Sequence, residues 1–504
     1  MNQKRGQGPG VGRRNPVLAP PPAFLHPSFL RPHPFIVSLM EDRAETFRRE
    51  PPPPLAPRSL NIPTPDEAVL PNGLRVVVVE SDRLPLVSFR LALRTGDAFD
   101  PPELAGLTDI TTHMLTEGTA TRTSKQIADE VARFGAALSA GSSSDHTTVA
   151  ASALATYSDA AFELLADVAL RPSFPEDELE LTKQNSQQNL IAQRAQPSFL
   201  ASETLARIIF GAHPYSVVSP TPESIDAMTR EKLIEFHRSM FVPNNAVLFA
   251  VGDIKRDVVM ERATALFGGW PPGAAAQSAW PALPKRRTRT MHLVDRPGSA
   301  QSNIVIANPA ITRTDPDYFP ALVMHTILGA NASSRLFMNL REDKGYTYGA
   351  YSSLDARRAA GTFRATAEVR AAVTGASLKE FFDELERIRE DDAAEKELKD
   401  AKSYLTGIFP IRLETQEGLI DQLVQIRMQD LPGDYLEAYR ERVNAVTVEE
   451  VRRAARKLIT PDRAAVVIVG DVAAISDQVR EYADDIEIYD SAGRRKEMNA
   501  ATSN

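Results

Sequence analysis

Cysteine is absent from the 504 residues, which excludes disulfides, thiolate nucleophiles and cysteine-ligated zinc sites. No apolar run approaches the ~18 residues of a transmembrane helix, so no membrane span is predicted. Basic residues are not in excess either: 58 Lys and Arg face 66 Asp and Glu, which argues against nucleic-acid binding. The rest is typical of a globular protein, and the length predicts roughly two to four domains.

Proline is concentrated at the start of the chain, where the first 65 residues hold 15 of the 37 prolines. This composition opposes helix and sheet, so residues 1–65 are predicted to form an extended, disordered tail. Basic residues from Lys4 to Arg14 could open a signal peptide, but Pro, His and Arg interrupt the stretch that follows. We therefore expect a cytoplasmic protein, whereas a true start at Met40 would leave a periplasmic location open.

An internal repeat relates two stretches of the chain at an offset of 218 residues. Residues 226–254 and 444–472 each read as a Thr-capped amphipathic helix, a Pro turn, an apolar strand and a Gly-Asp turn. The matched pairs are Thr229 with Thr447, Pro243 with Pro461, and Gly252-Asp253 with Gly470-Asp471. This offset is far too long for a solenoid and indicates two homologous domains in tandem.

Each half begins with two strands, continues into helices and ends on a strand, so the predicted fold class is α+β. We expect two tandem homologous domains of about 200 residues, each a mixed or antiparallel sheet packed by helices. The first of the two strands follows an Asn-Gly turn in LPNGLRVVVVES. The predicted boundaries are 66–270 and 291–490, with a Gly/Pro/Ala-rich linker at 271–290 and a tail at 491–504.

The stretch GLTDITTHMLTEGT is predicted to form a helix on which Asp109 and His113 lie one turn apart on one face. A catalytic zinc requires three protein ligands and a nearby base, and Thr112 is not a base near neutral pH. The residues alone therefore favour a core helix with one satisfied histidine. The other histidines considered, His213, His237, His292 and His325, have no His or Glu partner at the spacing of a metal-binding helix.

In the second half, SSRLFMNLREDKGYTYGAYSS predicts a helix ending at Gly345 and a strand carrying Tyr346, Tyr348 and Tyr351. Taken alone, Arg341 is expected to be a surface residue in the last helical turn. Tyr348, on the same basis, is expected to pack in the core of the sheet.

The segments LPNGLRVVVVES, RTGDAFDPPELAGLT, HMLTEGT, GAHPYS and FVPNNAVLFAVGD resemble the pitrilysin/insulinase family of zinc peptidases, family M16, and the resemblance extends from about residue 66 to 490. The family's zinc helix carries His-x-x-Glu-His. At the matching positions this chain has Asp109 for the first ligand, Thr112 for the base and His113 for the second ligand. The position of the third ligand, a Glu in the family, is Asn189, eight residues before Pro197.

The resemblance thus implies that this chain binds no metal of its own and does not hydrolyse peptides alone, although a residual Asp109/His113 metal contact stays open. The second half keeps the family pattern Leu-Arg-Glu-x-x-Gly-x-x-Tyr in full, with Arg341 and Tyr348. In the family these two residues hold the substrate backbone opposite the zinc. Their donors suit peptide carbonyls and a developing oxyanion.

By this resemblance the chain is half of a clamshell peptidase, a heterodimer with a His-x-x-Glu-His paralogue that carries the zinc. Its substrates would be peptides or unfolded polypeptides, bound as an added strand on a sheet edge. Two other functions remain possible. The chain could be a non-catalytic structural subunit of a larger complex, or a stand-alone peptide-binding protein.

Overall fold

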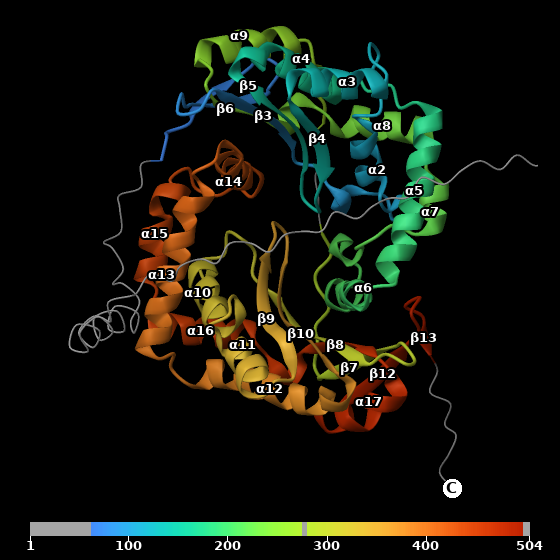
Figure 1. Cartoon of the computed structure of the whole chain (residues 1–504), viewed down its shortest axis with the longest axis vertical. Helices are drawn as coiled ribbons and strands as arrows, with labels where there is room; N and C mark the ends of the chain where they lie inside the picture. Colours follow the sequence, from blue (N-terminus) through green and yellow to red (C-terminus); the bar gives the residue numbers. More distant parts are fainter. Residues whose placement is uncertain (1–61, 275–279, 497–504) are drawn as a thin grey trace, which may run out of the picture. The chain divides into compact units, whose positions relative to one another are not determined.

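The computed structural model describes residues 62–274 and 280–496, which all lie within one compact unit, Ser59–Asn504 (Figure 1). Nearly all of the tail predicted for residues 1–65 lies outside this range. The described chain builds two β-sheets, each packed by helices. This confirms the α+β class and the two tandem domains.

The first sheet has the strand order β1-β2-β6-β3-β5-β4. Its strands are β1 (Asp66–Val69), β2 (Arg75–Glu80), β3 (Leu86–Leu93), β4 (Ala137–Ser142), β5 (Thr147–Leu154) and β6 (Ala246–Gly252). The predicted Asn-Gly turn joins β1 to β2, with Gly73 at φ +91°, a conformation that favours glycine. Only β2 and β6 pair in parallel, so the sheet is mixed.

The second sheet has the order β13-β12-β7-β11-β8-β10-β9, in which the last five strands repeat the order β2-β6-β3-β5-β4 of the first sheet. The other edge differs, because β12 pairs with β7 in parallel whereas β1 pairs with β2 antiparallel. Its strands are β7 (Thr290–Asp295), β8 (Gln301–Ala310), β9 (Thr347–Ala356), β10 (Gly361–Arg370), β11 (Ala465–Gly470), β12 (Asp485–Tyr489) and β13 (Arg495–Lys496). The repeat-related strands β6 and β11 occupy the same place and are fully buried, as their apolar sequences require. The strand β13 falls within residues 491–504, where the sequence predicts a tail.

Helices cover the outer face of each sheet (Figure 1). The first half contains α2 (Leu107–Met114), α3 (Ser124–Phe134), α4 (Ser158–Leu170), α5 (Glu176–Arg194), α6 (Pro197–Phe210), α7 (Pro222–Asp226), α8 (Arg230–Met240) and α9 (Arg256–Phe267). The second half contains α10 (Tyr318–Gly329), α11 (Arg335–Phe337), a π-helix (Met338–Asp343), α12 (Thr374–Glu390), α13 (Glu395–Arg412), α14 (Gln416–Met428), α15 (Tyr435–Ala445), α16 (Val448–Leu458) and α17 (Val472–Val479). Of the predicted linker, 271–290, the described residues 271–274 and 280–289 contain neither helix nor strand, and Thr290 already begins β7.

Two repeat-related helices are exchanged between the halves. The helix α6 packs on β8 and β11 of the second sheet, where Ile209 and Phe210 join a cluster with Val467. The helix α14 packs on β3 and β6 of the first sheet, where Ile420 joins a cluster with Phe249. Each sheet therefore completes its core with a helix from the other half.

Ionic contacts reinforce the seat of α14 on the first sheet. The guanidinium of Arg90 on β3 pairs with Glu417 at 2.6 Å and also with Asp421. The hydroxyl of Ser88 donates to Glu417 at 2.7 Å. These contacts fix the helix by its polar face as well as by its apolar one.

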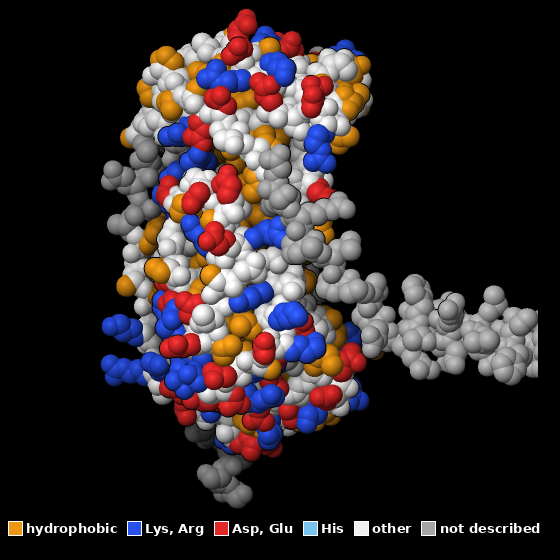
Figure 2. Space-filling model, turned by 90° about the vertical axis from the view of Figure 1, so that its left-hand side faces the viewer, with side chains coloured by type: hydrophobic (Ala, Val, Ile, Leu, Met, Phe, Trp, Pro, Cys, Tyr) orange, Lys and Arg blue, Asp and Glu red, His pale blue; other side chains and the backbone are white. Residues whose placement is uncertain are grey.

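The face shown in Figure 2 mixes acidic and basic side chains, with hydrophobic side chains scattered between them. Charge of one sign does not dominate this face, in keeping with the balanced composition. Among the helices of the described part of the chain, none combines the length and hydrophobicity needed to cross a bilayer.

Candidate functional site

The helix α2 carries the predicted zinc-helix positions, and the Asp100 carboxylate holds its start. Gly106, at φ +91°, and Thr108 each donate a backbone N–H to this carboxylate, at 2.9 and 3.0 Å. Burial raises the pKa of Asp100 to about 7, and the nearby Asp97 carboxylate adds to the effect. Burial also raises the pKa of Asp97 to about 6, against a hydrogen bond from Ser142. Two carboxyls with raised pKa values thus lie beside α2.

The structure brings Asp109 and Asn189 together, because α2 and α5 line one cavity of about 290 Å³. Burial raises the pKa of Asp109, although His113 opposes the shift. Thr112 does not line this cavity: its side chain is buried, and its hydroxyl has no hydrogen-bond partner among the described residues. The side chain of His113 is 59% exposed, with Nε2 at 3.9 Å from the Glu117 carboxylate.

These four positions do not fit a zinc ion. A catalytic zinc takes three His, Cys or carboxylate ligands in tetrahedral geometry, whereas the positions supply one histidine, one carboxylate and two neutral groups. Within residues 62–274 and 280–496, no three His, Asp or Glu side chains are placed to hold a metal ion. A base that could activate water is also missing at Thr112.

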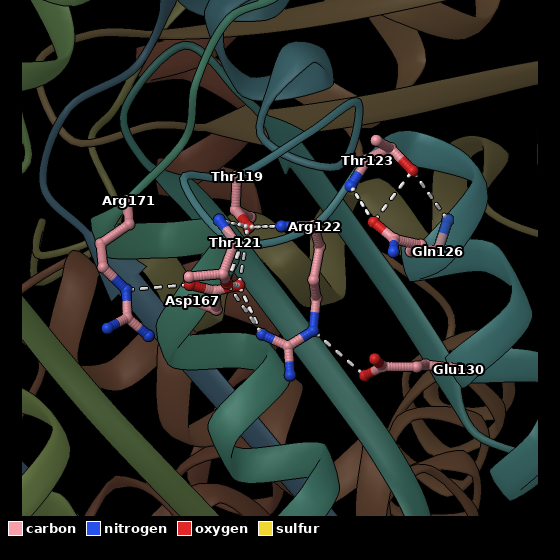
Figure 3. A network of polar contacts seen from close by, with 8 residues as sticks. All are labelled: Thr119, Thr121, Arg122, Thr123, Gln126, Glu130, Asp167 and Arg171. Atoms are coloured by element: carbon pink, nitrogen blue, oxygen red, sulfur yellow. Dashed lines mark hydrogen bonds and ion pairs between the residues drawn. The ribbon is translucent and has the colours of Figure 1, made fainter.

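The loop after α2 is held by a buried carboxylate, Asp167 on α4 (Figure 3). The hydroxyls of Thr119 and Thr121 donate to Asp167 at 2.7 and 3.0 Å. Arg122 and Arg171 pair with it at 2.7 and 2.8 Å. Because every oxygen of this carboxylate is engaged, its burial carries no unpaired charge.

This network gives the Gly-Thr at the end of the motif a structural role. Burial alone would raise the pKa of Asp167, but the hydrogen bonds from Thr119, Arg122 and Thr121 outweigh it and lower the pKa. Thr119 therefore holds the α2 loop to α4 and needs no metal chemistry to explain its presence.

Arg341 lies on the π-helix that continues α11, a wider turn than the regular helix predicted up to Gly345. Its guanidinium carbon lies 4.6 Å from the centre of the Phe337 ring, and its Nε lies 3.5 Å from the Glu342 carboxylate. Phe337 is buried and also contacts Tyr351, with ring centres 5.7 Å apart. The arginine is 45% exposed and leans on a fixed aromatic surface.

Tyr348 does not pack in the core, so the expectation drawn from its strand pattern alone is wrong. Tyr348 is 91% exposed and lies on β9, the edge strand of the second sheet. Two residues of β9, Tyr348 and Gly349, lie opposite the single residue Glu368 of β10, and this arrangement is a β-bulge. The Thr347 hydroxyl accepts a hydrogen bond from the Gly349 N–H at 3.1 Å. The bulge breaks the alternation of the strand and turns Tyr348 outward.

Comparison with known families identifies the family of this chain. A model described as "Insulinase (Peptidase family M16)" matches residues 75–219, and one described as "Peptidase M16 inactive domain" matches residues 227–405. The chain belongs to peptidase family M16.

Relatives within M16 differ in what their names claim. The "Uncharacterized zinc protease YmxG" of Bacillus subtilis is 24% identical over 404 residues, covering 79% of this chain and 96% of the relative. The "Non-peptidase homolog YmxG" of Helicobacter pylori is 24% identical over 385 residues, covering 75% and 87%. This M16 chain thus has relatives with both kinds of name.

Solved structures agree with the fold. The crystal structure of a peptidase M16 inactive domain from Pseudomonas fluorescens superposes with a TM-score of 0.76 at 28% identity, covering 81% of this chain and 98% of that one. A Helicobacter pylori protease gives a TM-score of 0.74 at 20% identity, covering 81% and 100%.

Sequence reasoning missed Phe337, the residue that supports Arg341. Its spacing of four residues before Arg341 is a signal that could have revealed it, since such pairs face each other on a helix. Arg341 and Tyr348 are carried by adjoining elements, the π-helix and β9. Within the described part of the chain, no hydrogen bond joins their side chains, and Arg341 contacts Glu342 and Phe337.

Proposed function

We propose that this chain is the peptide-binding subunit of a two-chain M16 peptidase. In this proposal Arg341 and Tyr348 bind and orient the peptide, while a His-x-x-Glu-His paralogue supplies the zinc and the base. The positions Asp109, Thr112, His113 and Asn189 then serve only the frame of the first half.

The observation that carries the proposal is the presentation of Tyr348. An exposed tyrosine on an edge strand lowers solubility and gains nothing from packing. In this chain a β-bulge nevertheless holds the Tyr348 side chain outward. The Tyr348 hydroxyl and the Arg341 guanidinium are hydrogen-bond donors. Among the described residues, the one acceptor near either group is the Glu342 carboxylate beside Arg341. Donors placed this way can stabilise a peptide carbonyl or the oxyanion formed on attack.

The edge of β9 also offers a mode of peptide binding. It is ten residues long and pairs on one side with β10, so its other side presents backbone donors and acceptors. An extended peptide can add to such an edge as a further strand. Tyr348 and Arg341 would then lie at one end of the bound segment.

The test uses this chain with and without a His-x-x-Glu-His M16 paralogue from the same genome. We expect the chain alone to bind no stoichiometric zinc and to cleave no peptide, and the mixture to cleave. Tyr348→Phe should lower the kcat of the mixture by about 10²–10³-fold, the usual effect of losing one oxyanion donor. Tyr404→Phe, an exposed tyrosine on α13, is the matched control and should leave the rate unchanged.

Zinc-dependent cleavage by this chain alone would refute the proposal. A mixture that assembles and cleaves equally well with Tyr348→Phe would instead favour a structural subunit. That outcome would leave the fold and the family assignment intact and remove only the role of the Arg341/Tyr348 pair.

A further inference from the structure

A second cavity, of about 270 Å³, lies between the two halves and shares Asp97, Val217 and Val218 with the cavity of Asp109 and Asn189. One wall is apolar and comes from α6, with Leu205, Ile209 and Phe210. The opposite wall is polar and comes from β9 and β10 of the second sheet. Asp109, Asn189, Arg341 and Tyr348 do not line it.

Two arginines reach this cavity, and their partners differ. Arg357 has an ionic partner, because its Nε pairs with Asp355 at 2.7 Å, and its Nη1 donates to Ser144 at 3.1 Å. Arg364 on β10 donates only its Nε, to the Ser353 hydroxyl at 2.9 Å. Its two terminal nitrogens have no hydrogen-bond or ion-pair partner in residues 62–274 and 280–496.

A half-buried guanidinium with free terminal nitrogens beside an apolar wall is a binding arrangement. The two terminal nitrogens suit a carboxylate, which they can bind through parallel hydrogen bonds. The apolar wall suits a hydrocarbon group of the same ligand, and the volume suits one residue better than a large molecule. Asp97 also lines the cavity and, with a pKa raised by burial to about 6, is largely ionised at pH 7, so the Arg364 guanidinium must outweigh its repulsion of an anion.

We propose that this cavity binds the C-terminal residue of a peptide, with Arg364 on the α-carboxylate and an apolar side chain against α6. The proposal rests on the peptide-binding role above and specifies its substrate class as peptides with a free, apolar C-terminus. It also accounts for the position of the cavity on the same strand as Tyr348. The lining residue Asp355 and Tyr348 are both on β9, toward opposite ends of the strand.

The experiment measures binding by the whole chain alone, by calorimetry at pH 7, with acetyl-Ala-Ala-Leu as the free acid and as the C-terminal amide. We expect the acid to bind at least tenfold more tightly than the amide. Arg364→Gln should reduce this ratio to within twofold. Arg370→Gln, which removes an exposed arginine from the end of the same strand, should leave the ratio unchanged.

A third probe, acetyl-Ala-Ala-Glu amide, separates a C-terminal carboxylate from a side-chain one. Binding of this probe as tightly as the free acid would overturn the assignment, as would equal binding of acid and amide. Should Arg364→Gln fail to fold, Ala206→Phe fills the cavity from α6 and must weaken the free acid at least tenfold; unchanged affinity would refute the site. Because no partner chain or zinc is needed, this result can fail while the Tyr348 effect on cleavage stands.

Discussion

The two halves share the order of five strands but differ sharply along the edge strands β4 and β9 and just before them. In the first half, α3 is a regular helix with a Thr123/Gln126 capping box, and it ends at Gly135, at φ +57°. In the second half, the matching stretch widens into a π-helix and ends at Gly345, at φ +64°. The edge strands differ as well, because β4 is short and built of small residues while β9 is longer, bulged and aromatic.

The difference teaches where a repeated domain is free to change. The central strands keep their order and burial because both sheets depend on them. The edge and its preceding helix bear fewer packing constraints, so a wider turn and a bulge could be accommodated there. The residues proposed to bind peptide lie where the second half departs from the first.

The largest effect is expected at Asp167, whose repeat-related residue at an offset of 216 is Asp383. Asp167→Ala leaves Arg122 and two threonine hydroxyls without their buried partner and should lower the free energy of unfolding by about 3 kcal/mol. Asp383 is exposed and pairs with Lys379 on the same helix, so Asp383→Ala should cost within about 0.5 kcal/mol. Urea denaturation of both variants measures the two losses in the free energy of unfolding. Equal losses would contradict a stabilising role for the Asp167 contacts shown in Figure 3.

A second contrast concerns pH. The native state holds the Asp97 proton up to about pH 6, whereas the unfolded state releases it near 3.8, so stability from this group is present at low pH and is lost as pH rises through 6. Asp97→Asn should therefore stabilise the chain by about 3 kcal/mol at pH 8 and by only about 0.5 kcal/mol at pH 4. Thermal denaturation at both pH values would detect the change.

The matching region of the second half supplies the control for pH. There Asp315 pairs with Lys457 at 3.2 Å, so Asp315→Asn should lower stability slightly at pH 8 or leave it unchanged. A stabilising Asp315→Asn variant, or an Asp97→Asn variant with the same effect at both pH values, would contradict the electrostatic account.

The exchange of α6 and α14 predicts effects that cross between the halves. Ile420→Val and Ile209→Val should each cost about 0.5–1.5 kcal/mol. Hydrogen exchange should quicken in β3 and β6 for Ile420→Val, and in β8 and β11 for Ile209→Val. Faster exchange confined to the half that carries the substitution would show that the exchanged helices contribute little.

The smallest effect is expected from the aromatic support of Arg341. Phe337→Leu removes a cation–π contact worth about 0.5–1 kcal/mol, so cleavage by the mixed subunits should fall roughly two- to fivefold. The first half offers a matched control, since Arg133 lies 4.6 Å from the centre of the Phe134 ring on α3. Phe134→Leu should leave the rate unchanged, and an equal loss in both variants would point to general destabilisation.

Much of the fold could be predicted because its signals are local. The offset of 218 residues, the apolar strands and the Asn-Gly turn at Gly73 all follow from spacing and turn chemistry. The exposure of Tyr348 could not, because a bulge depends on the register with β10 rather than on the strand's own residues. The apolar face of a helix likewise does not indicate which sheet it will cover, so the exchange of α6 and α14 could not be predicted from the sequence.

For the candidate site, the motif positions could be located but not their surroundings. The pairing of Asp109 with Asn189 in one cavity follows from the motif, because both are positions of a shared site. The burial of Thr112 and the support of Arg341 by Phe337 arise from packing between elements. Such contacts appear only once the helices are placed.

The seat of α14 on the first sheet also bears on how the chain folds during synthesis. The inner face of that sheet, including Phe249, is covered by residues that leave the ribosome roughly 160 positions after α9 is complete. At a synthesis rate of about 5–20 residues per second, this face stays uncovered for about 8–30 seconds until α14 has been made. During that interval the first domain exposes an apolar surface, which gives a chaperone a defined time and place to act.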